Sequence, residues 1–188
     1  MKYLVLSDIH GASEELSLAL NFYEKYQCDF IVLLGDLLNH GPRNTIPISY
    51  APQSVSSILN KYSEKIISVR GNCDSEVDSM MFNFPCNAPY GYLLQDKQRF
   101  FLTHGHLHKF DTDVDLLKLG LKAGDIVLSG HTHVQGIFKY DNGIVNINVG
   151  SISIPKGGTQ KGFGIIFEDR VDIFTLSGEV TGSFNFVR

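Results

Sequence analysis

Cysteine is scarce in this sequence of 188 residues, and no two cysteines form a CxxC pair. Cys28, Cys73 and Cys86 are an odd number with no recurrent spacing, which argues against a disulfide framework and for a reducing compartment. No apolar run approaches the roughly 20 residues of a membrane-spanning helix. The amino terminus reaches polar residues too soon for a signal peptide. We therefore expect a cytoplasmic protein that has no membrane partner.

An excess of basic residues is also missing, because 16 lysines and arginines face 20 acidic residues and the net charge is −4. General nucleic-acid binders carry a broad basic face, so the composition argues against an extended nucleic-acid track. A small anionic substrate remains compatible with it, since bound cations can reverse the local field. The hydrophobic fraction of 43% and the length predict one globular domain over residues 1–188, without linkers or repeats.

A run of apolar residues from Phe30 to Leu34 stops at Gly35 and Asp36. Such a run, without alternation, is typical of a strand buried on both faces of a parallel sheet. The other elements predicted in this half are strands at 2–7 and 66–69 and helices at 13–26 and from Pro52 onward. This alternation of strands and helices favours an α/β fold with parallel strands and right-handed crossovers.

The second half of the chain is richer in strand signals than in helix signals. Asp141-Asn142-Gly143 is a strong hairpin turn between two predicted strands. The predicted strands are 92–95, 99–102, 126–128, 134–140, 144–149, 163–167, 171–176 and 180–186, with short helices at 75–82 and near 114–121. We expect the last three strands to be antiparallel.

Side chains that commonly bind metals follow five of the predicted strands. They are Asp8 with His10, Asp36, Asn72, His104, and His131 with His133. One such residue alone is more often a helix cap or a satisfied polar group. Five endings together predict one site if the strands share one sheet, because open α/β sheets place ligands at the carboxyl ends of their strands. Imidazole, carboxylate and amide oxygen together suit manganese, iron or zinc. We predict that Asp36 bridges two divalent ions, as in two-metal hydrolases.

The ordered set of these motifs resembles the calcineurin-like metallophosphoesterase superfamily over about residues 1–155. The motifs are Asp8-Ile9-His10, Gly35-Asp36, Gly71-Asn72-Cys73-Asp74, Thr103-His104-Gly105-His106 and Gly130-His131-Thr132-His133. The segments 35–44, 69–78 and 150–158 are similar, more closely, to the YfcE-type branch of small bacterial phosphodiesterases.

The resemblance implies a single-domain α/β sandwich of two sheets with a centre of two metal ions. Manganese is the metal we expect first, and iron, zinc and nickel are the alternatives. The implied ligands are Asp8, His10, Asp36 and His133 for one ion, and Asp36, Asn72, His104 and His131 for the other. The implied reaction is in-line attack on the phosphorus of a small phosphodiester by a hydroxide that bridges the ions.

The sequence departs from the superfamily at Cys73, where many members have a histidine that contacts the phosphoryl group or the leaving group. A thiol has an ordinary pKa near about 8.5 and carries no positive charge. The YfcE-type branch shares this cysteine. We hypothesise that Cys73 biases the site toward singly charged diesters; the alternative is a cysteine that only fills a tight turn.

Other candidates surround these motifs. We expect Asn72 to contact a phosphoryl oxygen as well, and Asp74 to orient a ligand histidine. Arg43 suits a forked contact with phosphate and His40 suits a proton donor, because their loop leaves from Asp36. The alternative for both is an ordinary surface loop. Lys156 fits a phosphate contact too, but we interpret it as a mobile surface lysine.

Two alternatives to the phosphodiesterase stay open. A phosphomonoesterase would use the same centre, and a Vps29-like protein would use the same fold as a non-catalytic binding scaffold. The full set of potential ligands favours an enzyme, since a scaffold does not need it. A homo-oligomer, either a dimer or a tetramer, is compatible with the sequence, which does not identify the physiological substrate.

Overall fold

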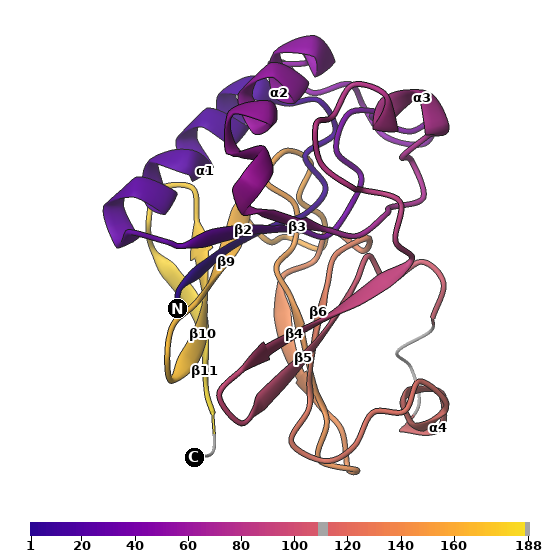
Figure 1. The fold of residues 1–188 in the computed structure, drawn as a ribbon, viewed down its shortest axis with the longest axis vertical. Coiled ribbons are helices and arrows are strands. Elements are labelled where there is room, and N and C mark those ends of the chain that lie inside the picture. Colours follow the sequence, from indigo (N-terminus) through magenta and orange to yellow (C-terminus); the bar gives the residue numbers. More distant parts are fainter. Residues whose placement is uncertain (109–112, 187–188) are drawn as a thin grey trace.

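The computed structural model describes residues 1–108 and 113–186, apart from the side chains of 113–115, and in it two β-sheets pack face to face (Figure 1). The first sheet has six strands in the order β11-β10-β9-β1-β2-β3, and the second has five in the order β4-β5-β6-β8-β7. The two-sheet α/β sandwich that the resemblance implied is confirmed. None of the described helices is long and apolar enough to cross a membrane.

The first sheet begins with the predicted alternation of strands and helices. Its elements are β1 (Tyr3–Leu6), α1 (Ser13–Tyr26), β2 (Phe30–Leu33), α2 (Pro52–Leu59), the 3-10 helix η1 (Asn60–Lys65) and β3 (Ile66–Ser68). β1 pairs in parallel with β2, and β2 with β3. The last strands, β9 (Gly162–Ile166), β10 (Arg170–Thr175) and β11 (Val180–Asn185), extend this sheet from β1 in antiparallel pairs. The predicted parallel order of the first half is therefore correct.

The apolar character of β1 follows from its two buried faces. Leu4 and Leu6 pack in the cluster that contains the apolar stripe of α1. Tyr3 and Val5, which point the other way, pack against residues of the second sheet. A strand covered on both sides needs apolar residues at every position, which explains the unbroken run.

The second sheet is built from the middle of the chain. Its strands are β4 (Tyr90–Gln95), β5 (Gln98–Thr103), β6 (Ile126–Ser129), β7 (Gly136–Lys139) and β8 (Val145–Asn148). β4 and β5 form a hairpin, β5, β6 and β8 are parallel, and β7 is antiparallel to β8. α4 (Asp113–Lys118) contributes Leu116 to a small outer core with Phe101 and Val127. The short α3 (Glu76–Ser79) follows β3, where we predicted a short helix.

The condition that we set for a single site, that the ligand-bearing strands share one sheet, is not met. β1, β2 and β3 belong to the first sheet, whereas β5 and β6 belong to the second. Their carboxyl ends nevertheless meet, because the ring of His104, which follows β5, contacts the backbone oxygen of Leu34, which follows β2, at 2.8 Å. The site therefore lies where the ends of two packed sheets converge.

Candidate metal centre

The backbone is strained at the residues expected to bind metal. Outside glycine, a positive φ is uncommon and costs on the order of 1–3 kcal/mol, so it persists only where the surroundings impose it. Seven described non-glycine residues have a positive φ, and five of them are predicted ligands: Asp8 (53°), His10 (49°), Asp36 (56°), His131 (66°) and His133 (60°). The turns after β1, β2 and β6 thus hold their polar side chains in conformations that the chain alone would avoid.

Buried hydroxyls fix the strained turn at Asp8. Its carbonyl oxygen accepts hydrogen bonds from Ser151 Oγ at 2.7 Å and from Ser153 Oγ at 2.9 Å. Its N–H donates to the carbonyl of Gly35 at 3.1 Å, which ties the end of β1 to the end of β2. Because these hydrogen bonds involve only the backbone of Asp8, they hold the turn without occupying its carboxylate.

The turn at Asp36 is held by Asp74. The Asp74 carboxylate accepts hydrogen bonds from the backbone N–H groups of Asp36 (2.9 Å), Leu37 (2.8 Å) and Gly71 (2.7 Å). The structure therefore gives Asp74 a different task from the one we expected, since its contacts are with backbone groups and not with a ligand histidine. Gly71 is packed so closely that a Cβ there would lie 2.1 Å from Asp36 Oδ1.

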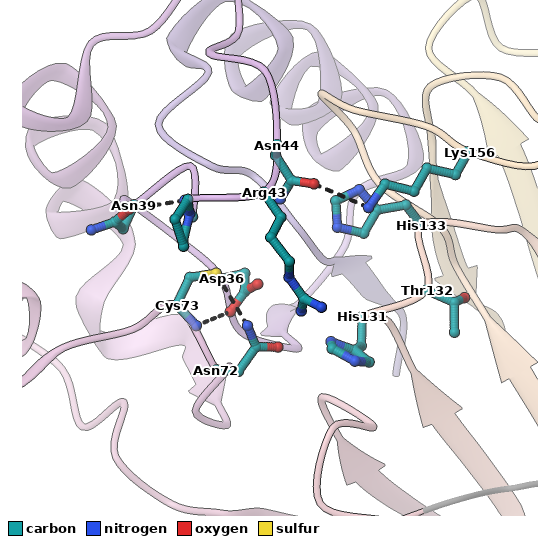
Figure 2. Close-up of a pocket in the computed structure, with 12 residues that line it drawn as sticks. Asp36, Asn39, Arg43, Asn44, Asn72, Cys73, His131, Thr132, His133 and Lys156 are labelled. Carbon is teal, nitrogen blue, oxygen red and sulfur yellow. Dashed lines mark hydrogen bonds between the residues drawn. The ribbon is translucent and has the colours of Figure 1, made fainter.

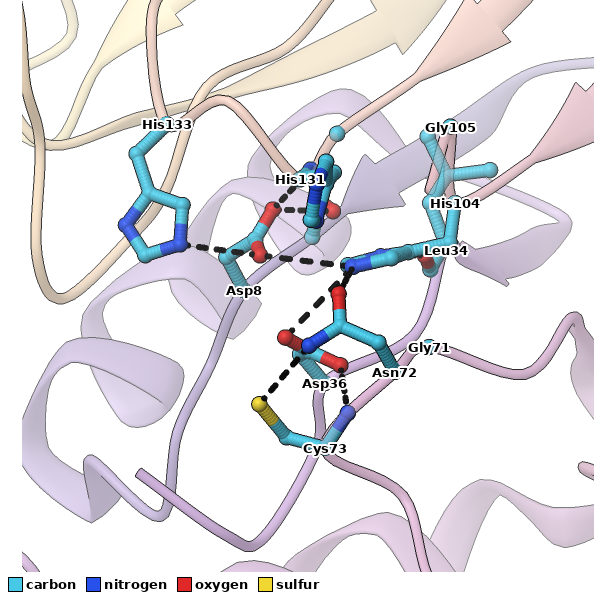
Figure 3. A network of polar contacts seen from close by, with 12 residues as sticks. Asp8, Leu34, Asp36, Gly71, Asn72, Cys73, His104, Gly105, His131 and His133 are labelled. Carbon is cyan, nitrogen blue, oxygen red and sulfur yellow. Dashed lines mark hydrogen bonds and ion pairs between the residues drawn. The ribbon is translucent and has the colours of Figure 1, made fainter. Parts of the chain in front are cut away.

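One group of potential ligands consists of Asp8, His10 and His133, whose ligand atoms lie within 4.8 Å of one another. Asp8 Oδ1 lies 3.2 Å from His133 Nε2 and 3.6 Å from His10 Nε2. Figure 3 shows His133, Asp8 and His104 converging from different loops. Asp8 Oδ1 is buried, yet no described group donates a hydrogen bond to it.

The second group consists of Asp36, Asn72 and His104, with His131 beside them. His104 Nε2 lies 3.1 Å from Asn72 Oδ1 and 3.4 Å from Asp36 Oδ2. The His131 ring centre is 5.1 Å from that of His104. Since Asp36 Oδ2 also lies 3.7 Å from His10 Nε2, Asp36 stands between the two groups.

Backbone carbonyls orient the buried histidine rings. The Nδ1 atoms of His10, His104 and His133 lie 2.7, 2.8 and 2.6 Å from the carbonyl oxygens of Asn39, Leu34 and Ile154. A carbonyl oxygen only accepts, so each Nδ1 carries the hydrogen, and in the neutral ring Nε2 presents its lone pair to the site. These carbonyls are partners that no side-chain motif reveals.

The electrostatics of the centre call for positive charge. Burial would raise the pKa of Asp8, but His104, His10 and His133 outweigh it and hold this pKa well below its usual value. Burial would lower the pKa of His104, but the carboxylates of Asp8 and Asp36 outweigh it and raise the pKa to about 9. Protons on the histidines or divalent cations supply the positive charge that these carboxylates require.

Divalent cations fit this donor set. The unpartnered Asp8 Oδ1 and the converging Nε2 atoms are acceptors without matching hydrogen donors, which is the arrangement that a cation satisfies. Nitrogen and oxygen ligands together suit manganese, iron, nickel or zinc. The residues that the sequence singled out as ligands are therefore brought together, although the structure leaves their roles as ligands a prediction.

A cavity of about 660 Å³ opens beside the centre. Asp36, Asn72, His131 and His133 belong to its wall. Arg43, predicted as a phosphate contact, also lines the cavity, and Figure 2 shows its side chain directed toward His131. His40 is absent from this lining, and its ring packs edge-on against Tyr50 instead. His40 as a proton donor thus stays a prediction without support from the cavity.

Cys73 lies on the cavity wall as a neutral thiol. Burial raises its pKa, and the charges of Asp36 and Asp74 add to this, so that the pKa reaches about 12. Its backbone N–H donates to Asp36 Oδ1 at 2.7 Å, and Asn72 Nδ2 donates to its sulfur at 3.2 Å. The residue that replaces a histidine therefore offers no positive charge to a ligand.

Sequence reasoning missed the groups that hold the site in shape. Ser151 and Ser153 donate hydrogen bonds to the carbonyl of Asp8, although they lie 143 and 145 positions away in the sequence. The one available signal was the polar stretch after the predicted strand 144–149, which we used only as part of the resemblance.

Comparison with known proteins shows the family of the chain. The model of the calcineurin-like phosphoesterase superfamily domain matches residues 1–170. Phosphodiesterase YfcE of Escherichia coli (strain K12) is 41% identical over 179 residues, which cover 95% of this chain and 94% of that protein. The solved structure of YfcE, a phosphoesterase from E. coli, superposes with a TM-score of 0.91 at 38% identity over 100% of both chains. Vacuolar protein sorting 29 from Cryptosporidium parvum shares the fold, with a TM-score of 0.66 at 17% identity over 98% and 97% of the two chains.

Proposed function

We propose that this chain is a phosphodiesterase acting on small phosphodiesters. It belongs to the calcineurin-like phosphoesterase superfamily, and its 41% identity to Phosphodiesterase YfcE identifies it as an enzyme of metal-dependent phosphoester hydrolysis. The observation that carries the proposal is the position of Asp36. Its Oδ2 atom is 3.7 Å from His10 Nε2 and 3.4 Å from His104 Nε2, between two groups of ligands, and the residue lines the cavity.

Two sets of residues would hold the ions in this proposal. The first set is Asp8, His10, Asp36 and His133, and the second is Asp36, Asn72, His104 and His131. Manganese is our first candidate, with iron, zinc and nickel as alternatives. When bound, such ions lower the pKa of water and neutralise phosphoryl oxygens.

The chain's own groups would position the diester. Arg43 lines the cavity and presents a planar fork of donors that matches two phosphate oxygens. Asn72 reaches the same cavity with its amide. Attack in line on phosphorus by a water-derived hydroxide requires such contacts, because they fix the direction of the leaving oxygen.

The neutral thiol of Cys73 favours a diester over a monoester. A monoester carries a second negative charge at neutral pH, and Cys73 offers no cation to meet it, because a thiol is never positively charged and burial raises the pKa of this one to about 12. The test is Cys73→Ser beside Cys73→His, with bis(p-nitrophenyl) phosphate and p-nitrophenyl phosphate as substrates. Cys73→His should shift the ratio of rates toward the monoester, and Cys73→Ser should not. An unchanged ratio in Cys73→His rejects this role for Cys73.

The non-catalytic scaffold is the competing function. The likeness to vacuolar protein sorting 29 is a likeness of fold alone at 17% identity. Hydrolysis of bis(p-nitrophenyl) phosphate before chelation, after chelation and after return of Mn²⁺ separates the two. Activity that disappears and returns supports the enzyme, whereas inactivity with Mn²⁺, Fe²⁺, Zn²⁺ and Ni²⁺ supports the scaffold. Cytoplasmic location and assembly into a dimer or tetramer stay predictions.

A further inference from the structure

One hydrogen bond joins two distant loops across the wall of the cavity. Lys156 Nζ donates to Asn44 Oδ1 at 3.0 Å, although the residues are 112 positions apart in the sequence. Both line the cavity, and Figure 2 shows the contact close to His133. Lys156 is exposed, as the sequence led us to expect, but its ammonium has a partner on the cavity wall.

Both partners are anchored at their backbones. Asn44 Nδ2 donates to the carbonyl of His40 at 2.9 Å, so that its Oδ1 is turned to the lysine. The backbone N–H of Lys156 donates to the carbonyl of His133 at 2.9 Å, and its own carbonyl accepts from Thr159 Oγ1 at 2.8 Å. The backbone of Lys156 is thus tied to a predicted metal ligand, and its exposed side chain is directed by the bond to Asn44.

The cavity wall carries two positively charged side chains, Arg43 and Lys156, that lack acidic partners among the described residues. Among the described residues, no carboxylate lies within ion-pair distance of Lys156 or Arg43. Asp36 is the one carboxylate on the described cavity wall, and its charge faces the metal centre. An ammonium has three N–H donors, and Asn44 occupies one of them. The remaining donors have no carboxylate partner among the described residues, and Lys156 lines the cavity.

The positively charged side chains of Arg43 and Lys156 occupy different parts of the cavity. In Figure 2 the guanidinium of Arg43 reaches toward His131, whereas the ammonium of Lys156 lies at Asn44, above His133. Arg43 is therefore placed for the phosphate that reacts, and Lys156 for a group bound further along the same wall.

We propose that Lys156, held by Asn44, binds a second anionic group on the substrate, carried by the ester arm that does not leave. This inference rests on the proposed function and narrows its substrate class to small phosphodiesters with a carboxylate or phosphate on the retained arm. A neutral arm of equal size gains less from the ammonium, because an amide oxygen accepts a hydrogen bond but brings no opposite charge.

The experiment uses two chromogenic diesters that differ by one charge. They are 3-carboxypropyl p-nitrophenyl phosphate and 3-carbamoylpropyl p-nitrophenyl phosphate, which share the leaving group and the length of the arm. For the Mn²⁺-loaded enzyme we expect kcat/KM for the carboxylate to exceed that for the amide about tenfold, as for a hydrogen bond between charged groups.

Variants assign this ratio to the lysine. Lys156→Met should bring the ratio close to one, and Lys156→Arg should keep most of it. Asn44→Ala should lower it, because the ammonium loses its anchor. Lys97→Met removes an exposed lysine of the β4–β5 turn and should leave the ratio as in the wild type. A wild-type ratio near one overturns the inference, as does a tenfold ratio that survives in Lys156→Met.

A binding measurement separates this inference from the proposed function. Calorimetry with 4-phosphonobutanoate and 4-phosphonobutanamide should show about tenfold tighter binding of the carboxylate, which Lys156→Met should remove. If neither ester is hydrolysed while the two phosphonates still bind with different affinities, the anion site is supported and the phosphodiesterase activity is rejected. If both esters are hydrolysed at the same rate and the two phosphonates bind with the same affinity, the phosphodiesterase activity is supported and the anion site is rejected.

Discussion

The Nε2 atoms of His10 and His133 lie 3.3 Å apart, and each ring has its Nδ1 on a backbone carbonyl. Two lone pairs at this distance repel each other unless a proton or a cation lies between them. Asp8 Oδ1 lies 3.2 Å from His133 Nε2, and no group in the part of the chain that the structure describes donates a hydrogen bond to it. A cation between these nitrogen and oxygen atoms would satisfy all three, so metal binding should stabilise this part of the protein.

Metal should stabilise the fold through these residues. At a hundredfold excess over Kd, Mn²⁺ should raise the Tm of the chelator-treated protein by about 5–10 °C. His10→Ala should lose most of this increment, whereas His40→Ala, whose ring packs on Tyr50 outside the cavity lining, should keep it. Thermal unfolding with and without Mn²⁺ measures the effect. Equal increments in the two variants would contradict the assignment.

Ser151 should contribute to stability by holding the strained turn. Its buried hydroxyl donates to the carbonyl of Asp8 and accepts from the N–H groups of Ser153 and Ile154. Ser151→Ala leaves the N–H groups of Ser153 and Ile154 without this acceptor, while the Asp8 carbonyl keeps only Ser153 Oγ, and should cost about 2 kcal/mol in the free energy of unfolding. Ser177→Ala, at an exposed turn, provides the control, and urea unfolding provides the measurement. A loss as small as in the control would show that the turn needs no such support.

Gly71 should be essential for the site on steric grounds. A Cβ at this position would lie 2.1 Å from Asp36 Oδ1 and 2.3 Å from Asp36 N. Gly71→Ala should therefore displace Asp36 and weaken Mn²⁺ binding at least about tenfold, as removal of other groups that support metal ligands does. Gly91→Ala, where the nearest atom would be 3.7 Å away, should bind Mn²⁺ normally. Normal binding by Gly71→Ala would refute the close packing.

The pH dependence of stability should reveal the ion pair of buried Glu15 with the partly exposed Lys161, whose charged atoms lie 2.6 Å apart. Burial would raise the pKa of Glu15, but Lys161 and Ser49 outweigh it and lower the pKa from 4.5. Because the folded pKa is the lower one, the contribution is complete above about pH 4.5 and is lost as the pH falls through the folded value.

Glu15→Gln should therefore cost up to about 1 kcal/mol at pH 7, because solvent screens the partly exposed Lys161, and the difference from the wild type should shrink toward pH 3. The exposed neighbour Glu14 provides the matched control as Glu14→Gln, which should change little at either pH. The measurement is the free energy of unfolding by urea between pH 3 and pH 7. A constant difference across this range would exclude the linkage.

The sequence predicted the strands of the first half well, because burial on both faces makes them continuous apolar runs. The run from Phe30 gave β2 almost to the residue, and Pro52 marked the start of α2. The structure brings the candidate ligands together, and the sequence singled them out because each closely follows a predicted strand; their role as ligands stays a prediction. Their convergence did not need a single sheet.

The rest depended on contacts between distant segments. The division of the ligand-bearing strands between two sheets depends on pairings such as β1 with β9, which join residues from opposite ends of the chain. Asp74 appeared to be a partner for histidine, but its acceptors are filled by backbone N–H groups that a sequence does not display. Lys156 appeared mobile because its partner lies 112 positions away.

The most direct test of the account is the anomalous scattering of crystals grown from Mn²⁺-loaded protein. We predict two manganese peaks about 3.5–4 Å apart, with the carboxylate of Asp36 between them. A single peak, or two peaks without Asp36 as a shared ligand, would contradict the centre on which the proposed chemistry depends.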